Sequence, residues 1–457
     1  MSWTIQNPDV PDDPCGAEPG FADWSGLPSA ARKDAAAACA ALAAEVQARF
    51  GCFVALGTAE AEAAGPLAGL PYAAKDMFDS VGRSPGCGLP GAADDASGPA
   101  PERAAVVLER LDRAGARRIG FTTMTALAYE PSGVGKALNP WNRDIVPGGS
   151  SSGSAVAVAA GAVFAALGSD TAGSLRIPAQ ACGVTAWKPT YGAVPVAGAM
   201  TLAPSLDTIG LLARSARDIQ LLAPVLATDM GFPSEPPARV ALLSDAVEAS
   251  EAPIQAACRN GAEAIAACGV FLEQRSGLSA IEALSDPLFL ILQAEAAAQH
   301  GGLALAARDP TLARRLAKGR DIAADRLAAA KAALSGATAP ILDSLFGEAG
   351  ALLLPVMPIR TPPVAMADPS SPDFHAATLY RLSAYTRFVN ALGLPAVAVP
   401  AGFDDRGMPV GLQIVGRPGT DGPLLALVAA LQARTGWHRR RPSEITDFPS
   451  PLAQRGS

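Results

Sequence analysis

The chain has 457 residues, of which 49% are hydrophobic and 17% charged, so it has ample apolar surface for a large core and disorder over most of its length is excluded. A net charge of −7, with no basic run longer than three residues, excludes the electrostatic footprint of a nucleic-acid-binding protein. No apolar stretch reaches the roughly 20 residues that a membrane span requires.

The N-terminal segment has no regular pattern. It begins MSWTIQNPDV, without the basic start and apolar stretch of a secretory signal, so we expect a cytoplasmic protein. Pro, Asp and Gly are frequent over residues 1–27 and predict an irregular arm, followed by an Ala-rich helix over 29–50. We assign residues 1–65 to this arm and its helices.

Helix and strand signals alternate in the next part of the chain. Residues 66–74 predict a turn and a short buried strand that ends at Lys75. An amphipathic helix is expected over 102–114, and a strand over 118–122. The alternation predicts an α/β fold with a mainly parallel or mixed sheet.

The segment 147–195 is the most unusual part of the sequence, because two Gly/Ser loops flank a helix and a strand at 165–169. We therefore expect the chemistry to lie there. Residues 221–350 are Ala-rich and indicate a variable helical insertion within a domain that spans 66–433. The C-terminal part predicts strands at 351–356, 395–400 and 409–415, a helix near 424–432, and a tail over 434–457.

Histidine and metal-ligand patterns are scarce. The three histidines, His300, His375 and His438, have no nucleophile-elbow motif GxSxG beside them. A general base must be fixed beside its nucleophile, so we expect each histidine to be structural or exposed. Seven cysteines without a Cys-x-x-Cys pair, and no carboxylates at ligand spacing, predict reduced thiols, no metal and no cofactor. A hydrolase with this sequence needs a different base.

The first Gly/Ser loop, GGSSSGS at residues 148–154, opens a helix. It lacks the Lys that a Walker A loop places before its hydroxyl residue. Alone, it is consistent with a phosphate-binding turn or with a simple tight turn.

The second loop changes this assessment. In GSDTAGSLRIP, residues 168–178, a strand ends at Asp170 and a turn of small residues leads to Ser174. Such a turn can direct several backbone N–H groups at one point, where they hold a developing oxyanion. With Lys75 after a buried strand, the chain offers a nucleophile, a shuttle and a base. The candidate oxyanion donors are the N–H groups of Thr171, Ala172, Gly173 and Ser174.

Four segments together resemble the amidase signature family. They are GLPYAAKDMFD around Lys75, NPWNRDIVPGGSSSGSAVAVAAG around Ser150, GSDTAGSLRIPAQACGVTAWKPTYG around Ser174, and GLPAVAVPAGFDDRGMPVGLQIVGRP near the C-terminus. The resemblance covers residues 66–433. It implies the amidase-signature fold, a mixed central β-sheet covered by helices on both faces.

The resemblance also implies roles for individual residues. Lys75 corresponds to the catalytic base, Ser150 to a bridging serine in a cis peptide after Gly149, and Ser174 to the serine that is acylated. The implied reaction is acyl transfer, in which neutral Lys75 takes a proton from Ser150 as Ser150 takes one from Ser174. Water then hydrolyses the acyl-enzyme.

Four further residues are supporting candidates. Ser151 and Asp170 are expected to hold the loops by hydrogen bonds, and Arg176 to anchor the segment after the nucleophile. Met124 is a candidate substrate contact, with ordinary core filling as an equal alternative.

Several functions stay open at this point. The first is a free-standing amidase acting on a small or aryl-alkyl carboxamide, or on a urea-like amide such as allophanate. The second is the glutaminase-like A subunit of a tRNA amidotransferase, although that subunit's Asp for the glutamine amino group falls on Ser383. The third is a catalytically dead scaffold, which a complete set of relay residues disfavours.

We expect the partner to be a small-molecule amide, not nucleic acid or membrane, and the sequence leaves a homodimer open. The substrate cavity is predicted to draw on residues after 221 and on loops near Arg360 and Arg381. Arg381 or Arg387 either meets a substrate carboxylate or is simply solvated.

Overall fold

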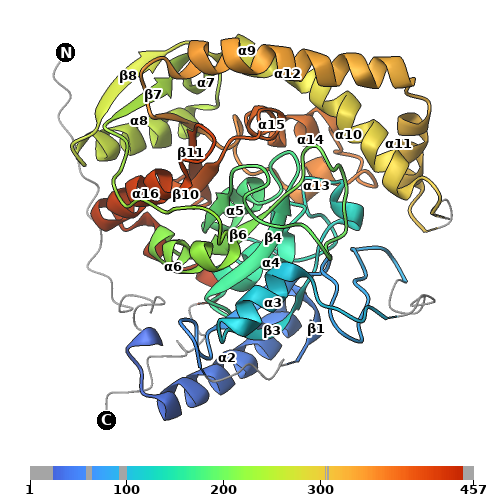
Figure 1. The fold of residues 1–457 in the computed structure, drawn as a ribbon, viewed down its shortest axis with the longest axis vertical. Coiled ribbons are helices and arrows are strands. Elements are labelled where there is room, and N and C mark those ends of the chain that lie inside the picture. Colours follow the sequence, from blue (N-terminus) through green and yellow to red (C-terminus); the bar gives the residue numbers. More distant parts are fainter. Residues whose placement is uncertain (1–23, 58–63, 92–99, 304, 306–307, 446–457) are drawn as a thin grey trace.

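The computed structural model describes residues 24–57, 64–91, 100–303, 305 and 308–445 (Figure 1). Most of the irregular arm predicted for 1–27 therefore lies outside the described residues. The strands are β1 (Phe53–Leu56), β2 (Pro71–Lys75), β3 (Arg117–Thr122), β4 (Ala165–Asp170), β5 (Thr185–Lys188), β6 (Thr208–Ala213), β7 (Arg239–Leu243), β8 (Phe271–Arg275), β9 (Ala351–Pro355), β10 (Ala396–Phe403) and β11 (Pro409–Gly416).

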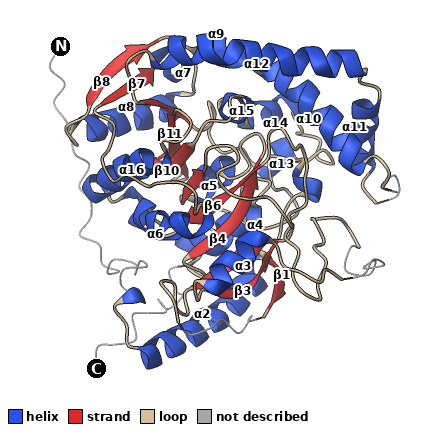
Figure 2. Ribbon diagram, viewed as in Figure 1, coloured by secondary structure: helices blue, strands red, loops and turns tan. Residues whose placement is uncertain are grey.

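The α-helices surround these strands (Figure 2). They are α2 (Ser29–Phe50), α3 (Val106–Arg113), α4 (Ser152–Ala159), α5 (Arg176–Cys182), α6 (Ala216–Leu226), α7 (Ser244–Glu248), α8 (Ala252–Ala266), α9 (Leu278–Glu282), α10 (Ser285–His300), α11 (Pro310–Arg320), α12 (Ala324–Phe346), α13 (Val364–Ala367), α14 (Ala376–Leu382), α15 (Arg387–Ala391) and α16 (Asp421–Thr435).

The strands form one 11-stranded mixed sheet in the order β1-β3-β2-β4-β6-β5-β10-β11-β9-β7-β8. The strand β2 pairs in parallel with β3 and β4, whereas β4 pairs antiparallel with β6. Parallel pairing brings the carboxyl ends of β2 and β4 to the same edge. The predicted α/β fold with a mixed sheet is confirmed.

Helices cover both faces of this sheet. Side chains along a strand alternate between the faces, and successive residues of β4 divide accordingly between two hydrophobic clusters. Ala166 packs in a cluster with α2, α4 and α5, and Leu167 in a cluster with α3, α6, α8 and α16. The arrangement implied by the sequence is therefore present.

Some helices and strands begin or end at residues other than those predicted. The helix expected from residue 102 begins at Val106, because the N–H groups of Ala105 and Val106 donate to loop carbonyls of Asp79 and Ala197. The strand β1 lies in the segment assigned to an arm and helices, yet it pairs with β3 at the edge of the sheet. At the other end, α16 continues past the predicted boundary at 433.

The region predicted as a helical insertion also contains two strands. Within residues 221–350, β7 and β8 pair in parallel, and β7 joins the sheet through β9. Short apolar runs such as RVALL in β7 do not distinguish a buried strand from a helix by periodicity. The segments that carry Lys75 and Ser174 lie on β2 and after β4, so these two additional strands do not change where we expect the site.

Candidate active site

Lys75 is the last residue of β2 and is fully buried. Its Nζ lies 2.7 Å from Ser150 Oγ, 2.8 Å from Ser169 Oγ and 3.0 Å from Ser151 Oγ. No carboxylate contacts this nitrogen in the part of the chain that the structure describes. The amine is therefore held by three neutral hydroxyl groups.

This environment changes the acidity of Lys75. Burial lowers its pKa to about 7, while the more distant carboxylates of Asp170 and Asp207 act in the opposite direction. Desolvation disfavours the charged ammonium, so a large share of the side chain is the neutral amine near pH 7. A neutral amine has a lone pair that can accept a proton from a hydroxyl group.

Ser150 and Ser151 reach Lys75 from the loop that precedes α4. The peptide bond between Gly149 and Ser150 is cis, as the resemblance implied. Space for the loop depends on Gly168 of β4, where a Cβ would lie 2.8 Å from Ser151 Oγ. The N–H of Ser151 donates to the carbonyl of Ser174 at 3.2 Å, which joins the two predicted loops at this point.

Ser174 lies in the turn between β4 and α5. The carboxylate of Asp170 organises this turn: it accepts the N–H of Gly173 at 2.8 Å and that of Leu175 at 3.1 Å. Gly173 has φ +131° and a Cβ there would lie 2.3 Å from Thr386 Oγ1, so any larger residue would disrupt the turn. The turn therefore presents Ser174 in a fixed orientation.

The set of candidate oxyanion donors is narrower than the sequence predicted. Because the N–H of Gly173 donates to Asp170, it is already engaged. Those of Thr171, Ala172 and Ser174 remain as candidates. The hydroxyl of Thr171 donates to Asp207 Oδ1 at 2.6 Å, which steadies the start of the turn.

Arg176 forms a fully buried ion pair with Asp170. Its Nε lies 3.0 Å from Asp170 Oδ2, and its Nη2 lies 2.9 Å from Oδ1. Burial by itself raises the pKa of Asp170, but Arg176, Lys188 and the Leu175 N–H outweigh it and hold the pKa at about 2. The predicted supporting role of both residues agrees with this geometry.

Sequence reasoning missed the residues that complete this network. Arg176 also donates to Asn390 Oδ1 at 2.6 Å and to Gln413 Oε1 at 2.9 Å, and Asn390 donates to the carbonyl of Asp170 at 2.8 Å. Ser169, the third contact of Lys75, was also missed. Its place beside Lys75 follows from the parallel pairing of β2 and β4, which the structure shows and the sequence pattern does not.

Replacement of Arg176 by methionine should destabilise the fold by about 3–5 kcal/mol, because it leaves the Asp170 carboxylate buried without its partner. The control is Arg113→Met, which removes an exposed i,i+4 pair with Glu109 and should change stability by less than about 1 kcal/mol. Urea titration of both variants measures the free energy of unfolding. Equal effects would contradict the assigned role of Arg176.

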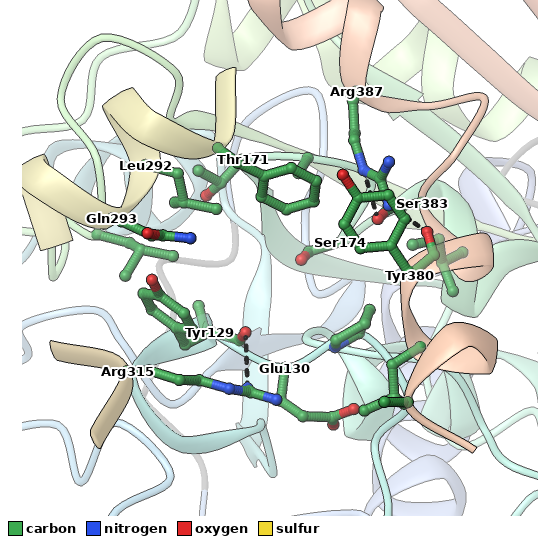
Figure 3. Close-up of a pocket in the computed structure, with 18 of the residues that line it drawn as sticks. Tyr129, Glu130, Thr171, Ser174, Leu292, Gln293, Arg315, Tyr380, Ser383 and Arg387 are labelled. Carbon is green, nitrogen blue, oxygen red and sulfur yellow. Dashed lines mark hydrogen bonds between the residues drawn. The ribbon is translucent and has the colours of Figure 1, made fainter. Parts of the chain in front are cut away.

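A cavity of about 520 Å³ opens at Ser174 (Figure 3), within the range of about 300–1,000 Å³ typical of small-molecule sites. One wall is formed by residues 128–131 and the nucleophile turn. The others come from α10 and α11 and from the segment 374–387. The helices α10 and α11 of this wall lie in the region after 221.

Not every residue singled out from the sequence reaches this cavity. Met124 is 1% exposed and packs in the hydrophobic core, so it is corrected from a candidate substrate contact to a core residue. Arg360 pairs with Glu251 and Asp405, and Arg381 lies 3.9 Å from Glu251. Arg387, by contrast, lines the cavity.

The three histidines are elsewhere. The ring of His300 contacts the carbonyl of Thr201 at 2.7 Å, and burial lowers the pKa of His438 to about 4. His375 precedes α14. None of them contacts Lys75 or Ser174, so no histidine stands in the position of a general base.

Metal-ligand clusters and long apolar helices are both missing from the described ranges. No group of three or more His, Cys, Asp or Glu side chains in those ranges is placed to hold a metal ion. None of the helices there combines the length and hydropathy that crossing a bilayer requires.

Comparison with known proteins agrees with this geometry. Residues 38–425 match the model of a family described as amidase. The chain belongs to the amidase family. It is therefore an amidase-signature hydrolase that acts on C–N bonds, and its Lys75–Ser150 contact fits a Ser-Ser-Lys triad.

Individual relatives carry several names. The A subunit of glutamyl-tRNA(Gln) amidotransferase from Deinococcus radiodurans is 33% identical over 416 residues, which cover 80% of this chain and 84% of that protein. A crystal structure described as an amidase has a TM-score of 0.73 at 30% identity and covers 87% of this chain and 96% of its own. The structure of 6-aminohexanoate cyclic dimer hydrolase in complex with substrate has a TM-score of 0.80 at 25% identity. The match covers 91% of this chain and 96% of that chain.

Proposed function

We propose that the protein hydrolyses a carboxamide through an acyl-enzyme on Ser174, with Ser150 as the proton shuttle and Lys75 as the base. The observation that carries this proposal is the buried Lys75 Nζ, 2.7 Å from Ser150 Oγ and with a pKa of about 7. A base is most effective when its pKa lies near the working pH.

The first half of the reaction forms the acyl-enzyme. Neutral Lys75 takes the proton of Ser150, and Ser150 takes that of Ser174, whose Oγ forms a bond to the amide carbon. The carbonyl oxygen becomes an oxyanion, for which the N–H groups of Thr171, Ala172 and Ser174 are available donors.

The second half releases the products. The C–N bond breaks as the relay returns its proton to the leaving nitrogen, which departs as ammonia or an amine. A water molecule then loses a proton to the relay and attacks the acyl carbon, which frees Ser174 and the carboxylic acid. Lys75 ends in its starting state, so no external reactant besides water is needed.

We favour a free-standing amidase over a component of an amidotransferase, although the curated relatives include many such components. The residue at the position of their glutamine-binding Asp is Ser383, which lines the cavity and carries no charge to pair with an amino group. The test is ammonia release by the isolated chain from a panel of amides that includes glutamine. Hydrolysis restricted to glutamine, or absent without added partner chains, would overturn this choice.

A pair of serine variants from the same loop tests the shuttle. Ser150→Ala should reduce kcat/KM by about 10²–10⁴-fold, because it removes the hydroxyl that contacts Lys75 and that is proposed to carry the proton from Ser174. Ser152→Ala should leave activity within about twofold, since Ser152 Oγ is buried and has no hydrogen-bond partner among the described residues. Steady-state ammonia release measures both, and equal losses would show that the loop, not the Ser150 hydroxyl, is what matters.

A further inference from the structure

Arg387 is a buried cation on the wall of the substrate cavity. The residue is 2% exposed, and it lines the same cavity as Ser174. Its Nε donates to Ser383 Oγ at 3.0 Å, its Nη1 to Ser285 Oγ at 3.5 Å, and its Nη2 to the carbonyl of Tyr380. All three acceptors are neutral.

The charge of Arg387 is not balanced by a carboxylate. Within the described part of the chain, no Asp or Glu forms an ion pair with it, whereas the equally buried Arg176 pairs with Asp170. Burial lowers the pKa of Arg387 to about 10, so the guanidinium stays protonated at neutral pH. A buried charge without an opposite charge costs free energy, and a bound anion would relieve that cost.

Two aromatic rings hold the guanidinium in place. Its centre lies 4.4 Å from the ring centroid of Phe289 and 4.1 Å from that of Tyr380, distances typical of cation–π contacts. The rings come from α10 and α14, and both residues line the cavity. They orient the group and leave its charge uncancelled.

Arg387 is also close to the reacting atoms. The preceding residue, Thr386, donates its hydroxyl to the carbonyl of Ala172 in the nucleophile turn at 2.5 Å. Consecutive Cα atoms are about 3.8 Å apart, so the Arg387 backbone lies within one residue of that turn. Since both residues also line the same cavity, a small molecule can touch Ser174 and Arg387 together.

The other charges around the cavity are compatible with an anion at Arg387. Arg315 and Lys318 of α11 add positive charge to the wall. The carboxylate of Glu130 is already held by the N–H groups of Ser132 and Gly133, at 2.7 and 3.0 Å. Asp286 is the remaining acid on the wall, and it is exposed to solvent.

We infer that the substrates are small amides that carry a carboxylate, which Arg387 binds through two N–H groups while the amide carbonyl meets Ser174. An arginine fork matches the geometry of a carboxylate, and Ser383 and Tyr380 fix its orientation. This inference rests on the amidase function proposed above and names the substrate class of the same site.

The experiment compares monoamides of dicarboxylic acids with three to six carbons against neutral amides of the same length that end in a methyl group. Wild type should prefer the acids by at least about tenfold in kcat/KM, the effect of one charged hydrogen-bonded contact. In Arg387→Met the acids should lose about 10- to 100-fold, mainly through KM, while the neutral amides change little.

Arg381→Met is the matched control, because Arg381 lies in the last turn of α14, in the same segment, but faces Glu251 instead of the cavity. It should keep the wild-type preference. Arg387→Lys should keep part of the preference for acids, since lysine retains the positive charge but lacks the two-pronged guanidinium. If Arg387→Met does not fold, Arg387→Lys takes its place in the experiment. Equal turnover of acids and neutral amides by wild type, or an unchanged ratio in the Arg387 variant, would overturn the inference.

Labelling with a fluorophosphonate in the same samples separates the two proposals. Label on Ser174 together with no preference for acids would refute only the role of Arg387. No label on Ser174 of wild type would refute the amidase mechanism, and the inference with it.

Discussion

Ser174→Ala should abolish amide hydrolysis, with a loss in kcat on the order of 10⁴-fold or more. The variant has no oxygen to form the acyl-enzyme, and only binding and oxyanion stabilisation would remain. Ammonia release measures the loss, and mass spectrometry after fluorophosphonate treatment should locate the label on Ser174 of wild type and nowhere in the variant. The fold should persist, since the Asp170 contacts that shape the turn are to backbone N–H groups.

The control for this experiment is again Ser152→Ala, which should label at the wild-type rate. If Ser174→Ala retained near-normal turnover, or if the label appeared on Ser150, the assignment of the nucleophile would be wrong.

Lys75→Met should reduce kcat/KM by about 10²–10⁴-fold, because no other basic side chain among the described residues contacts Ser150. The wild-type enzyme should show the ionisation of this lysine. Below its pKa of about 7 the side chain is an ammonium that cannot accept a proton, so kcat/KM should rise with pH and level off above about pH 8. A pH profile from 5 to 9 measures this, and the rising limb should be absent in the variant's residual activity.

Lys136→Met serves as the matched lysine control. Lys136 is half-buried and donates to the carbonyl of Gly88, without contact with the serines. It should keep both the rate and the pH profile of wild type. A profile that is flat in wild type, or one that is unchanged in Lys75→Met, would show that another group controls the reaction.

The relay could be predicted because its parts are local and have distinctive sequences. Lys75 follows a short buried strand, and Ser150 and Ser174 lie in Gly-rich loops whose residue types are constrained by tight turns. Hydrogen bonds of Lys75 join it to the loop that carries Ser150 and Ser151. Ser169 was missed because a serine inside a buried strand has no pattern of its own.

The network behind the nucleophile could not be predicted in the same way. Asn390 and Gln413 lie more than 200 residues from Arg176 in sequence, with separations of 214 and 237. Only the order of the sheet, which places β10 next to β5 and β11 next to β10, brings them together. The local hydrophobic pattern of a sequence cannot predict contacts between residues so far apart.

The cavity wall was the least predictable part. Apart from Glu130, its charged residues lie on α10, α11 and α15, in or after an Ala-rich region whose pattern suits many helical arrangements. Whether an arginine there is solvated or buried depends on how those helices pack. Arg381 and Arg387, six residues apart, have opposite environments.

The Asp170–Arg176 pair has a consequence for how the chain assembles. Arg176 of this pair also donates to Thr386, to Asn390 of α15 and to Gln413 of β11, so the buried guanidinium has all its hydrogen-bond partners only when these C-terminal segments have docked. A chain still lacking those strands holds the three relay residues but not the frame that orients them. We therefore expect reactivity to arise only once the last strands of the sheet are in place.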